Sequence, residues 1–433
     1  MQSKTPRILI LSSCSLKQGP ALIADQYYSA LKEKGCDADL LLKYPEPNRE
    51  DIKYVLKKEG IGLFFYGIAR KFLKFLCRRK PLKEGYFFSY DKENAPPVPV
   101  SMVLKNIKKT YDLVLVVFWQ GMISFKTIDK IYDKLHCQIQ FLGVDYSHMS
   151  GGCHFTNGCD NYMTGCGCCP AFESNDTNDY TAWNVRYRKE VYDKVQPIVY
   201  GNLYMMDFYK RSYLLKNVTC ELGIGSAIIN TDVFKPLDPS LYRNTYHIPE
   251  SKKHIIFFAS QNLADKKKGV DYLLESFALL KKMVDSVNEI LVLMAGKEYE
   301  KIKEKIPFDS YNLGYVPMDK LPEIFSIASF FVCPSVNDAG PMMVGQSLCC
   351  GTPVVGFDMG SVKELIKDRG TGFCVPLKDT NGLAKAMYDM MHLDRDVYEK
   401  MSNNCRNNAL QCCSYAAQAD HIINIYNKYR KND

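Results

Sequence analysis

The stretch from Pro334 to Gly360 combines residue types that bind phosphate and sugar hydroxyls. A turn with Gly340 and Pro341 leads into a helix, and backbone N–H groups at a helix start are free to bind a phosphate or a hydroxyl. Asp338 lies in the turn and Gln346 on the helix. Their side chains can each hydrogen-bond a pair of vicinal hydroxyls, one pair on a sugar and the other on a ribose. This stretch therefore predicts a site for a ligand with phosphate, sugar and ribose groups.

A cysteine cluster is the second chemical feature. Four cysteines lie close together with glycines between them: Cys153, Cys159, Cys166 and Cys169. They are separated by five, six and two residues, and Cys168 and His154 are spare ligands. Four thiolates at this spacing can close a tetrahedral site, for which zinc is the first candidate and an iron–sulfur cluster the second. Unligated thiols are the remaining alternative.

Cysteine usage also indicates the compartment. The chain has 17 cysteines among 433 residues, many of them in apolar segments, and its N-terminal run MQSKTPRILILSS has no small-residue cleavage site. Scattered unpaired thiols without an export signal indicate a reducing, cytoplasmic location and disfavour disulfides. No stretch offers 18 uninterrupted apolar residues, so we expect no transmembrane helix.

Part of the net charge of +8 is local, because six basic residues fall between positions 71 and 83. Aromatic and basic residues alternate at helical spacing over 57–83. Such a face can lie on anionic lipid at the inner side of a membrane and bring a lipid-linked acceptor to the site. The alternative is a pair of helices packed on their own domain with solvated basic residues. We expect no nucleic-acid partner.

Strands alternate with helices along most of the chain, which predicts parallel α/β sheets. Before residue 230, the pattern predicts strands at 7–13, 39–43, 111–119, 138–144, 196–200 and 220–223, and helices at 21–34 and 126–135. Two further helices are expected between 50 and 90. Residues 150–180 break the periodicity and form a cysteine-rich insertion.

A polar, proline-bearing connector at 230–239 separates this pattern from a second one. The second pattern predicts strands at 254–260, 290–295, 329–333 and 353–357, and helices at 270–282, 321–326, 344–350, 381–392 and 414–430. The fold class is thus α/β, with two doubly wound Rossmann-like domains, 1–230 and 231–413, that face a cleft. The last helix, within 414–433, is expected to cross back onto the first domain. No GxGxxG follows the first strand, which argues against a dinucleotide cofactor.

These motifs resemble those of retaining family 4 glycosyltransferases of the GT-B fold. That family has an acidic residue, seven further residues and a glutamate, followed by CGTPVV. The frame here is Asp338, seven residues, Gln346 and CCGTPVVGF. The resemblance implies that position 338 contacts the donor sugar and position 346 the ribose. Both positions depart from the family's glutamates, which bears on rate and donor choice more than on fold.

The segment FASQNLADKKKGVDYLLESF, residues 258–277, resembles the family's strand, loop and helix at the donor diphosphate. The resemblance implies that Lys268 contacts that diphosphate, where a cation stabilises the leaving group without a catalytic metal. A solvated lysine run is the alternative. Gln261 stands near the place of the family's arginine. The implied donor-binding residues are Gly19, Gln261, Lys268, Gly340, Pro341, Met342, Met343 and Gln346.

Two N-terminal segments, VVFWQGMIS and FLGVDYSHMSGGCH, are similar to the family's HWxxGFLS and LHDMxxxTGGCH. Asp145 matches the family's aspartate, whereas Val144 replaces the histidine before it. Gly19 matches the glycine loop near the diphosphate or the acceptor. The resemblance therefore predicts Asp145, Lys268 and Asp338 as catalytic residues.

The resemblance implies a capsule- or exopolysaccharide-type enzyme with an acceptor domain at 1–230 and a donor domain at 231–413. It would transfer a hexose-type sugar, with retention, from a UDP- or GDP-sugar to a glycan or lipid-linked glycan. One rival is a non-catalytic nucleotide- or sugar-binding protein on the same fold, which the residues at 144, 338 and 346 favour. A sugar-phosphate isomerase or epimerase is a weaker rival, because the seven histidines form no convincing set with carboxylates.

Overall fold

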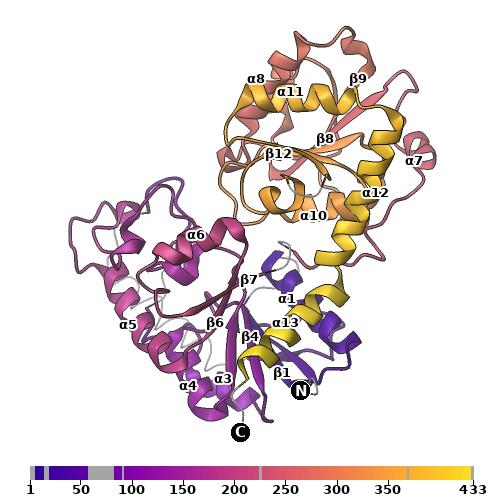
Figure 1. The fold of residues 1–433 in the computed structure, drawn as a ribbon. Coiled ribbons are helices and arrows are strands. Elements are labelled where there is room, and N and C mark those ends of the chain that lie inside the picture. The colour runs from indigo at the N-terminus through magenta and orange to yellow at the C-terminus, as the bar shows by residue number, and fades with distance from the viewer. Residues whose placement is uncertain are drawn as a thin grey trace. The chain divides into compact units, whose positions relative to one another are not determined.

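The computed structural model describes residues 5–13, 19–56, 82–89, 92–223, 227–367 and 370–430. The chain divides into two compact units (Figure 1). The first comprises Met1–Gly201, Met205–Leu222 and Ala419–Asp433, and the second Asn202–Tyr204 and Gly223–Gln418. The sequence pattern placed the two changes of domain after residues 230 and 413, whereas the units change after residues 222 and 418.

The first unit is built on a seven-stranded parallel sheet with the order β3-β2-β1-β4-β5-β6-β7. Its strands are β1 (Ile8–Ser12), β2 (Ala38–Leu42), β3 (Lys53–Tyr54), β4 (Leu113–Phe118), β5 (Gln138–Phe141), β6 (Ile198–Gly201) and β7 (Thr219–Leu222). The central strand β4 is apolar along its whole length because helices cover both faces of a doubly wound sheet. β1 is buried at every position.

The helices of this part of the chain are α1 (Gly19–Glu33), α3 (Val100–Asn106), α4 (Phe125–Leu135), α5 (Tyr180–Val195), α6 (Leu203–Arg211) and α13 (Tyr415–Tyr429). The sequence pattern identified α1, α4 and α13 but not α3, α5 or α6. The two helices expected between 50 and 90 fall largely on residues outside the described ranges, as does most of the basic stretch 57–83. The described part of that region contains β3, which the pattern missed.

The second unit is built on a six-stranded parallel sheet with the order β10-β9-β8-β11-β12-β13. Its strands are β8 (His254–Asn262), β9 (Ile290–Lys297), β10 (Asp309–Asn312), β11 (Phe330–Cys333), β12 (Val354–Phe357) and β13 (Gly372–Val375). Its helices are α7 (Pro239–Thr245), α8 (Val270–Lys281), α9 (Leu321–Ile327), α10 (Met342–Cys349), α11 (Thr380–Met391) and α12 (Arg395–Cys412). Here the expected elements agree with the structure to within a few residues, and α7, α12, β10 and β13 are additions.

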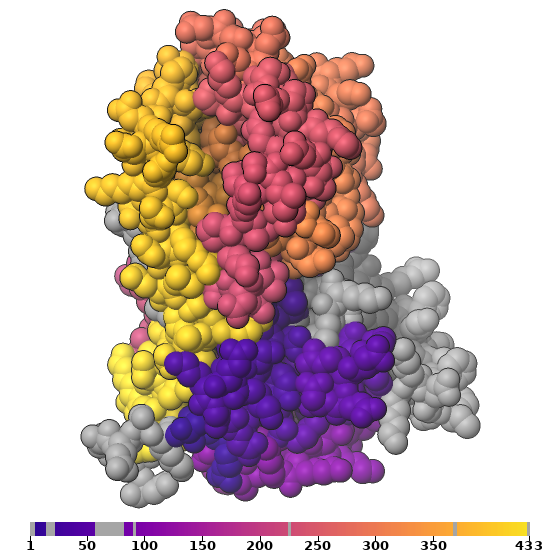
Figure 2. Space-filling view, turned by 90° about the vertical axis from the view of Figure 1, so that its right-hand side faces the viewer, coloured from indigo at the N-terminus to yellow at the C-terminus, as the bar shows by residue number. Residues whose placement is uncertain are grey.

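Two apolar clusters cover the two faces of the second sheet. One packs α8 and α11 on the sheet, and the other packs α9, α10 and α12 on it. Figure 1 shows α8 and α11 side by side on one face and α10 on the other. α12 presents its polar side to solvent, and the C-terminal helices, in yellow, lie on the surface in Figure 2. Within the described ranges, no helix is long and apolar enough to cross a membrane.

Candidate functional site

In the second unit, two loops meet at the carboxyl edge of the sheet. β8 lies between β9 and β11, so the connections run outward from it in opposite directions. Such a switch point is where open α/β sheets bind their ligands. The turn after β8 carries Lys268, and the loop after β11 carries Asp338. The sheet topology therefore brings two of the predicted site residues to a ligand-binding edge.

Gly269 docks the first of these loops on the second. Its φ is +71°, and a Cβ atom there would lie 1.8 Å from the carbonyl oxygen of Pro334. The backbone N–H of Val336 also donates to the carbonyl of Lys267 over 2.9 Å. Only glycine combines this backbone conformation with so close an approach. The Lys-Gly pair in the sequence is thus explained by the contact that places Lys268 beside Asp338.

Lys268 and Asp338 form an ion pair at the surface of this edge. Lys268 Nζ lies 2.5 Å from one carboxylate oxygen of Asp338, and their side chains are 35% and 15% exposed. The other carboxylate oxygen accepts the backbone N–H of Gly340 over 3.1 Å. Burial lowers the pKa of Lys268, but the charge and hydrogen bond of Asp338 outweigh burial and raise it. The lysine therefore stays cationic, as the binding of a phosphate requires.

The loop continues into the start of α10. Pro341 is the N-cap residue, and Met342 and Met343 in the first turn pack partly against the core. The first N–H groups of a helix have no partner within it, so they are available to an anion. Gly360 packs closely against this turn. A Cβ atom at position 360 would lie only 2.9 Å from the carbonyl oxygen of Asp338.

Gln346 is buried on α10, and its amide Nε2 lies 3.1 Å from Sδ of Met318. Met318 is 41% exposed, and Tyr315 in the same loop is 83% exposed. The sequence analysis did not single out these two residues. They could have been identified from their position directly after β10, at the same carboxyl edge as the loops of Lys268 and Asp338.

Three further predicted residues are divided between the two units. Gln261 is exposed near the end of β8 in the second unit. Gly19 is the first residue of α1, and Asp145 follows β5, so both belong to the first unit.

Asp145 is buried at the carboxyl edge of the first sheet. One carboxylate oxygen accepts the backbone N–H of Ser147 over 2.8 Å, and the other lies 2.6 Å from Nδ1 of His154. Burial raises the pKa of Asp145, but the nearby histidine and the hydrogen bonds lower it overall. The sequence analysis treated His154 only as a spare metal ligand. In the structure both of its ring nitrogens are engaged, Nε2 by the hydroxyl of Ser89 at 2.8 Å.

His148, the other histidine of this segment, is fully buried. Its ring packs edge-on against Trp119 and Phe141. Burial lowers its pKa to about 4, so the ring is neutral near pH 7. It is therefore a core residue in this structure.

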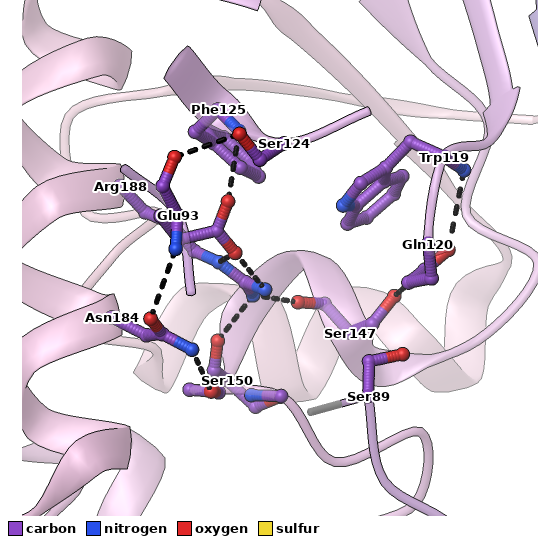
Figure 3. A network of polar contacts seen from close by, with 12 residues as sticks. Ser89, Glu93, Trp119, Gln120, Ser124, Phe125, Ser147, Ser150, Asn184 and Arg188 are labelled. Carbon is purple, nitrogen blue, oxygen red and sulfur yellow. Dashed lines mark hydrogen bonds and ion pairs between the residues drawn. The ribbon is translucent and has the colours of Figure 1, made fainter. Parts of the chain in front are cut away.

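A buried ion pair lies under the same segment (Figure 3). Arg188 on α5 and Glu93 approach to 2.6 Å, and their side chains are 2% and 3% exposed. Arg188 also donates to the carbonyls of Ser147 and Ser150 over 2.6 and 2.5 Å. Glu93 accepts the backbone N–H of Phe125, the first residue of α4, over 2.8 Å. The pair therefore joins α4 and α5 to the chain that carries Asp145, and no motif in the sequence predicted it.

The four clustered cysteines line one cavity of about 30 Å³, together with Phe88, Tyr162 and Thr181. Burial raises the pKa of the Cys153 thiol to about 11 and that of Cys169 to about 12, and it raises the pKa of Cys166 further. Backbone groups of Gly151 and Ala171 hydrogen-bond Cys166 and Cys169 and oppose this effect.

Whether this cavity fits a metal ion follows from the arrangement of the side chains. Within the described ranges, no group of three or more His, Cys, Asp or Glu side chains is placed so that it could hold a metal ion. The thiols therefore share a cavity, but they do not form a preassembled metal site. The metal predicted from their spacing stays a prediction.

Residues 242–411 match the family model described as glycosyl transferases group 1. Among curated relatives, the chain is 24% identical to the putative glycosyltransferase EpsD of Bacillus subtilis, over 49% of this chain and 55% of that protein. The chain thus spans about half the length of the curated relatives that it matches first. The matched residues lie within the second unit and make up less than half of the chain.

Solved structures resemble the fold over nearly the whole chain. Sucrose-phosphate synthase of Thermosynechococcus elongatus has a TM-score of 0.65 and 15% identity, covering 97% of this chain and 98% of its own. HepE of Anabaena, solved with UDP and glucose, has a TM-score of 0.63 and 12% identity, covering 98% of this chain and 99% of its own. These likenesses confirm the predicted fold class, two parallel α/β units of the GT-B type.

Proposed function

We propose that the protein is a glycosyltransferase that takes a hexose-type sugar from a UDP- or GDP-sugar and transfers it to a glycan or lipid-linked glycan. The observation that carries this proposal is the Lys268–Asp338 pair at the switch point of the second unit, within the residues that match the family model. A partly exposed cation beside a helix start suits a diphosphate, and a carboxylate next to it suits a sugar hydroxyl.

Within this proposal, each residue has a distinct task. Lys268 and the first N–H groups of α10 bind the diphosphate and stabilise the charge that develops on it as the sugar leaves. Asp338 contacts the donor sugar, and Gln346 holds the ribose. To Tyr315, whose side chain is largely exposed, we assign stacking on the base. No step in this scheme requires a catalytic metal.

Retention and the role in capsule or exopolysaccharide synthesis are also part of the proposal. A retaining transfer needs no dedicated base, because the donor phosphate can take the acceptor proton. This accords with Val144, where the related enzymes have a histidine. A cytoplasmic location is also part of the proposal, because many cysteines scattered through apolar segments suit a reducing compartment.

The test is calorimetric titration of the purified chain with UDP, GDP and their glucose, galactose and mannose conjugates, followed by an assay of donor hydrolysis. Binding with slow hydrolysis of the same donor supports the enzyme. Binding without hydrolysis and without transfer to any supplied glycan favours the non-catalytic rival. Failure to bind any nucleotide refutes the transferase and a nucleotide-binding rival, and leaves only a sugar-binding protein.

A further inference from the structure

A second candidate ligand site lies in the first unit, at the carboxyl edge of its own sheet. β1 is flanked by β2 and β4, so this sheet also has a switch point where ligands are expected. β4 ends at Phe118, whose ring stacks on that of His154 with the centroids 5.8 Å apart. His154 therefore lies at this edge of the sheet.

The backbone around His154 aligns three side chains. Phe88 and Cys153 form an antiparallel bridge, and the N–H of His154 donates to the carbonyl of Phe87 over 2.9 Å. The N–H of Ser89 donates to the carbonyl of Gly152 over 2.8 Å. Because side chains alternate along an extended segment, those at 87 and 89 share one face and that of Phe88 takes the other. Phe88 is buried beside the cysteine cavity, so the face with positions 87 and 89 points away from it.

The hydroxyl of Ser89 is held in a fixed orientation. The carboxylate of Asp145 accepts from Nδ1 of His154, and in the neutral ring Nε2 then accepts the hydroxyl proton of Ser89. Two lone pairs on the serine oxygen then remain for a donor from a ligand. Ser147 in turn holds Asp145, which makes the chain of contacts rigid.

An exposed aromatic ring stands next to this hydroxyl. Phe87 is 56% exposed, and its ring lies against that of His154 with the centroids 4.3 Å apart. A pyranose offers C–H groups on its faces and hydroxyls on its rim, and it therefore suits an aromatic ring beside a fixed polar group. The ring of Phe87 and the hydroxyl of Ser89 both contact the imidazole of His154, so an apolar and a polar partner for such a sugar lie next to each other.

We propose that Phe87 and Ser89 bind the sugar ring of the acceptor, with His154 and Asp145 as positioning residues. Phe87 stacks on a face of the ring, and Ser89 accepts a hydrogen bond from one of its hydroxyls. The ligand class is a neutral pyranose at the end of a glycan. That this sugar is the acceptor rests on the proposed function, whereas the binding of a pyranose does not.

The experiment measures binding of methyl glycosides of glucose, galactose, mannose and N-acetylglucosamine by saturation-transfer NMR without nucleotide. We expect wild type to bind at least one of them, and Phe87→Ala and Ser89→Ala to weaken that binding by about tenfold. Phe87→Trp should retain it, because the stacking surface remains. Tyr44→Ala removes another exposed aromatic ring of the first unit and should leave binding unchanged.

Two outcomes would overturn the site: no methyl glycoside binds wild type, or Phe87→Ala and Ser89→Ala bind as wild type does. Donor titration of the same variants separates this inference from the proposed function. Normal nucleotide-sugar binding with unaltered glycoside binding in both variants contradicts the acceptor site alone. If the wild type binds no nucleotide sugar, the transferase is contradicted. The pyranose site is then tested by glycoside binding alone. Phe87 is at the surface, so its alanine variant tests the site even if Ser89→Ala unfolds.

Discussion

Two ion pairs with nearly the same contact distance serve the molecule in different ways. Glu93 and Arg188 in the first unit approach to 2.6 Å, and Lys268 and Asp338 in the second to 2.5 Å. The first pair is almost fully buried, whereas the lysine of the second is 35% exposed. Burial removes the first pair from exchange with any ligand, and exposure leaves the second open to a phosphate.

The neighbours of each pair reinforce this difference. Arg188 spends its remaining donors on backbone carbonyls, so the guanidinium ties three parts of the chain together. Lys268 carries a compact ammonium with three donors and reaches solvent. The environment of an ion pair, and not its contact distance, therefore indicates whether the pair supports the structure or binds a ligand.

The largest effect is expected where the buried pair is broken. Arg188→Met leaves Glu93 without its cation in the interior and should lower the free energy of unfolding by about 3–5 kcal/mol. Urea denaturation measures it. The matched control is Lys194→Met, which removes an exposed lysine bonded to Asp129 and Asp133 and should change stability little. Equal stability of the two variants would show that the buried pair has no special structural weight.

The second prediction concerns the cysteine cavity, which lies on the segment that Arg188 secures. We expect the purified protein to carry about one equivalent of zinc, or a brown iron–sulfur chromophore, once the thiols turn toward the centre of the cavity. Cys166→Ser should lose the metal and unfold at a lower temperature. The control is Cys137→Ser, a buried cysteine outside the cluster, which should keep the metal. Elemental analysis that finds neither zinc nor iron, on protein made without chelators, would contradict the metal site and show that the four thiols are unligated.

The third prediction concerns the ion pair of Lys268 and Asp338. Lys268→Ala should weaken nucleoside-diphosphate binding by about 1.5–3 kcal/mol, the usual value of a charged hydrogen bond. Its free energy of unfolding should fall by less than that of Arg188→Met, because this pair is only partly buried and Asp338 keeps the N–H of Gly340. Lys266→Ala, an exposed lysine on the same turn, is the control for calorimetry and should bind as wild type does. If both variants bind with the same affinity, Lys268 is an ordinary surface lysine.

The smallest effect is expected at Gln346. Gln346→Leu should weaken donor binding by about 1–3 kcal/mol, because the ribose hydroxyls then lack a partner. Gln346→Glu restores the residue of the related enzymes and should be tolerated. Titration of both variants with the donor identified for wild type decides this, and unchanged affinity in Gln346→Leu would remove the ribose role. A large loss of folding stability in that variant would instead assign the buried amide a structural role.

Local sequence patterns predicted the helices and strands of the second unit more completely than those of the first. There, apolar runs alternate regularly with amphipathic segments, and the predicted strands and helices match the observed ones closely. In the first unit, α5 was missed because it follows the glycine-rich cysteine segment and carries polar residues such as Asn184 and Arg188 on its buried side. Those residues are buried only because Glu93 and backbone groups 30 to 100 residues away satisfy them.

The sequence by itself determined the alternation of strands and helices, the two-domain α/β fold and the types of residue at the donor edge, because these depend on local periodicity and short motifs. Only the tertiary structure decided which residues meet. The contact of Gly269 with Pro334 and the ion pair of Lys268 with Asp338 join parts of the chain about 70 residues apart. The link from Ser89 to His154 depends on the antiparallel bridge between Phe88 and Cys153, whereas the link from His154 to Asp145 forms within the segment that follows β5.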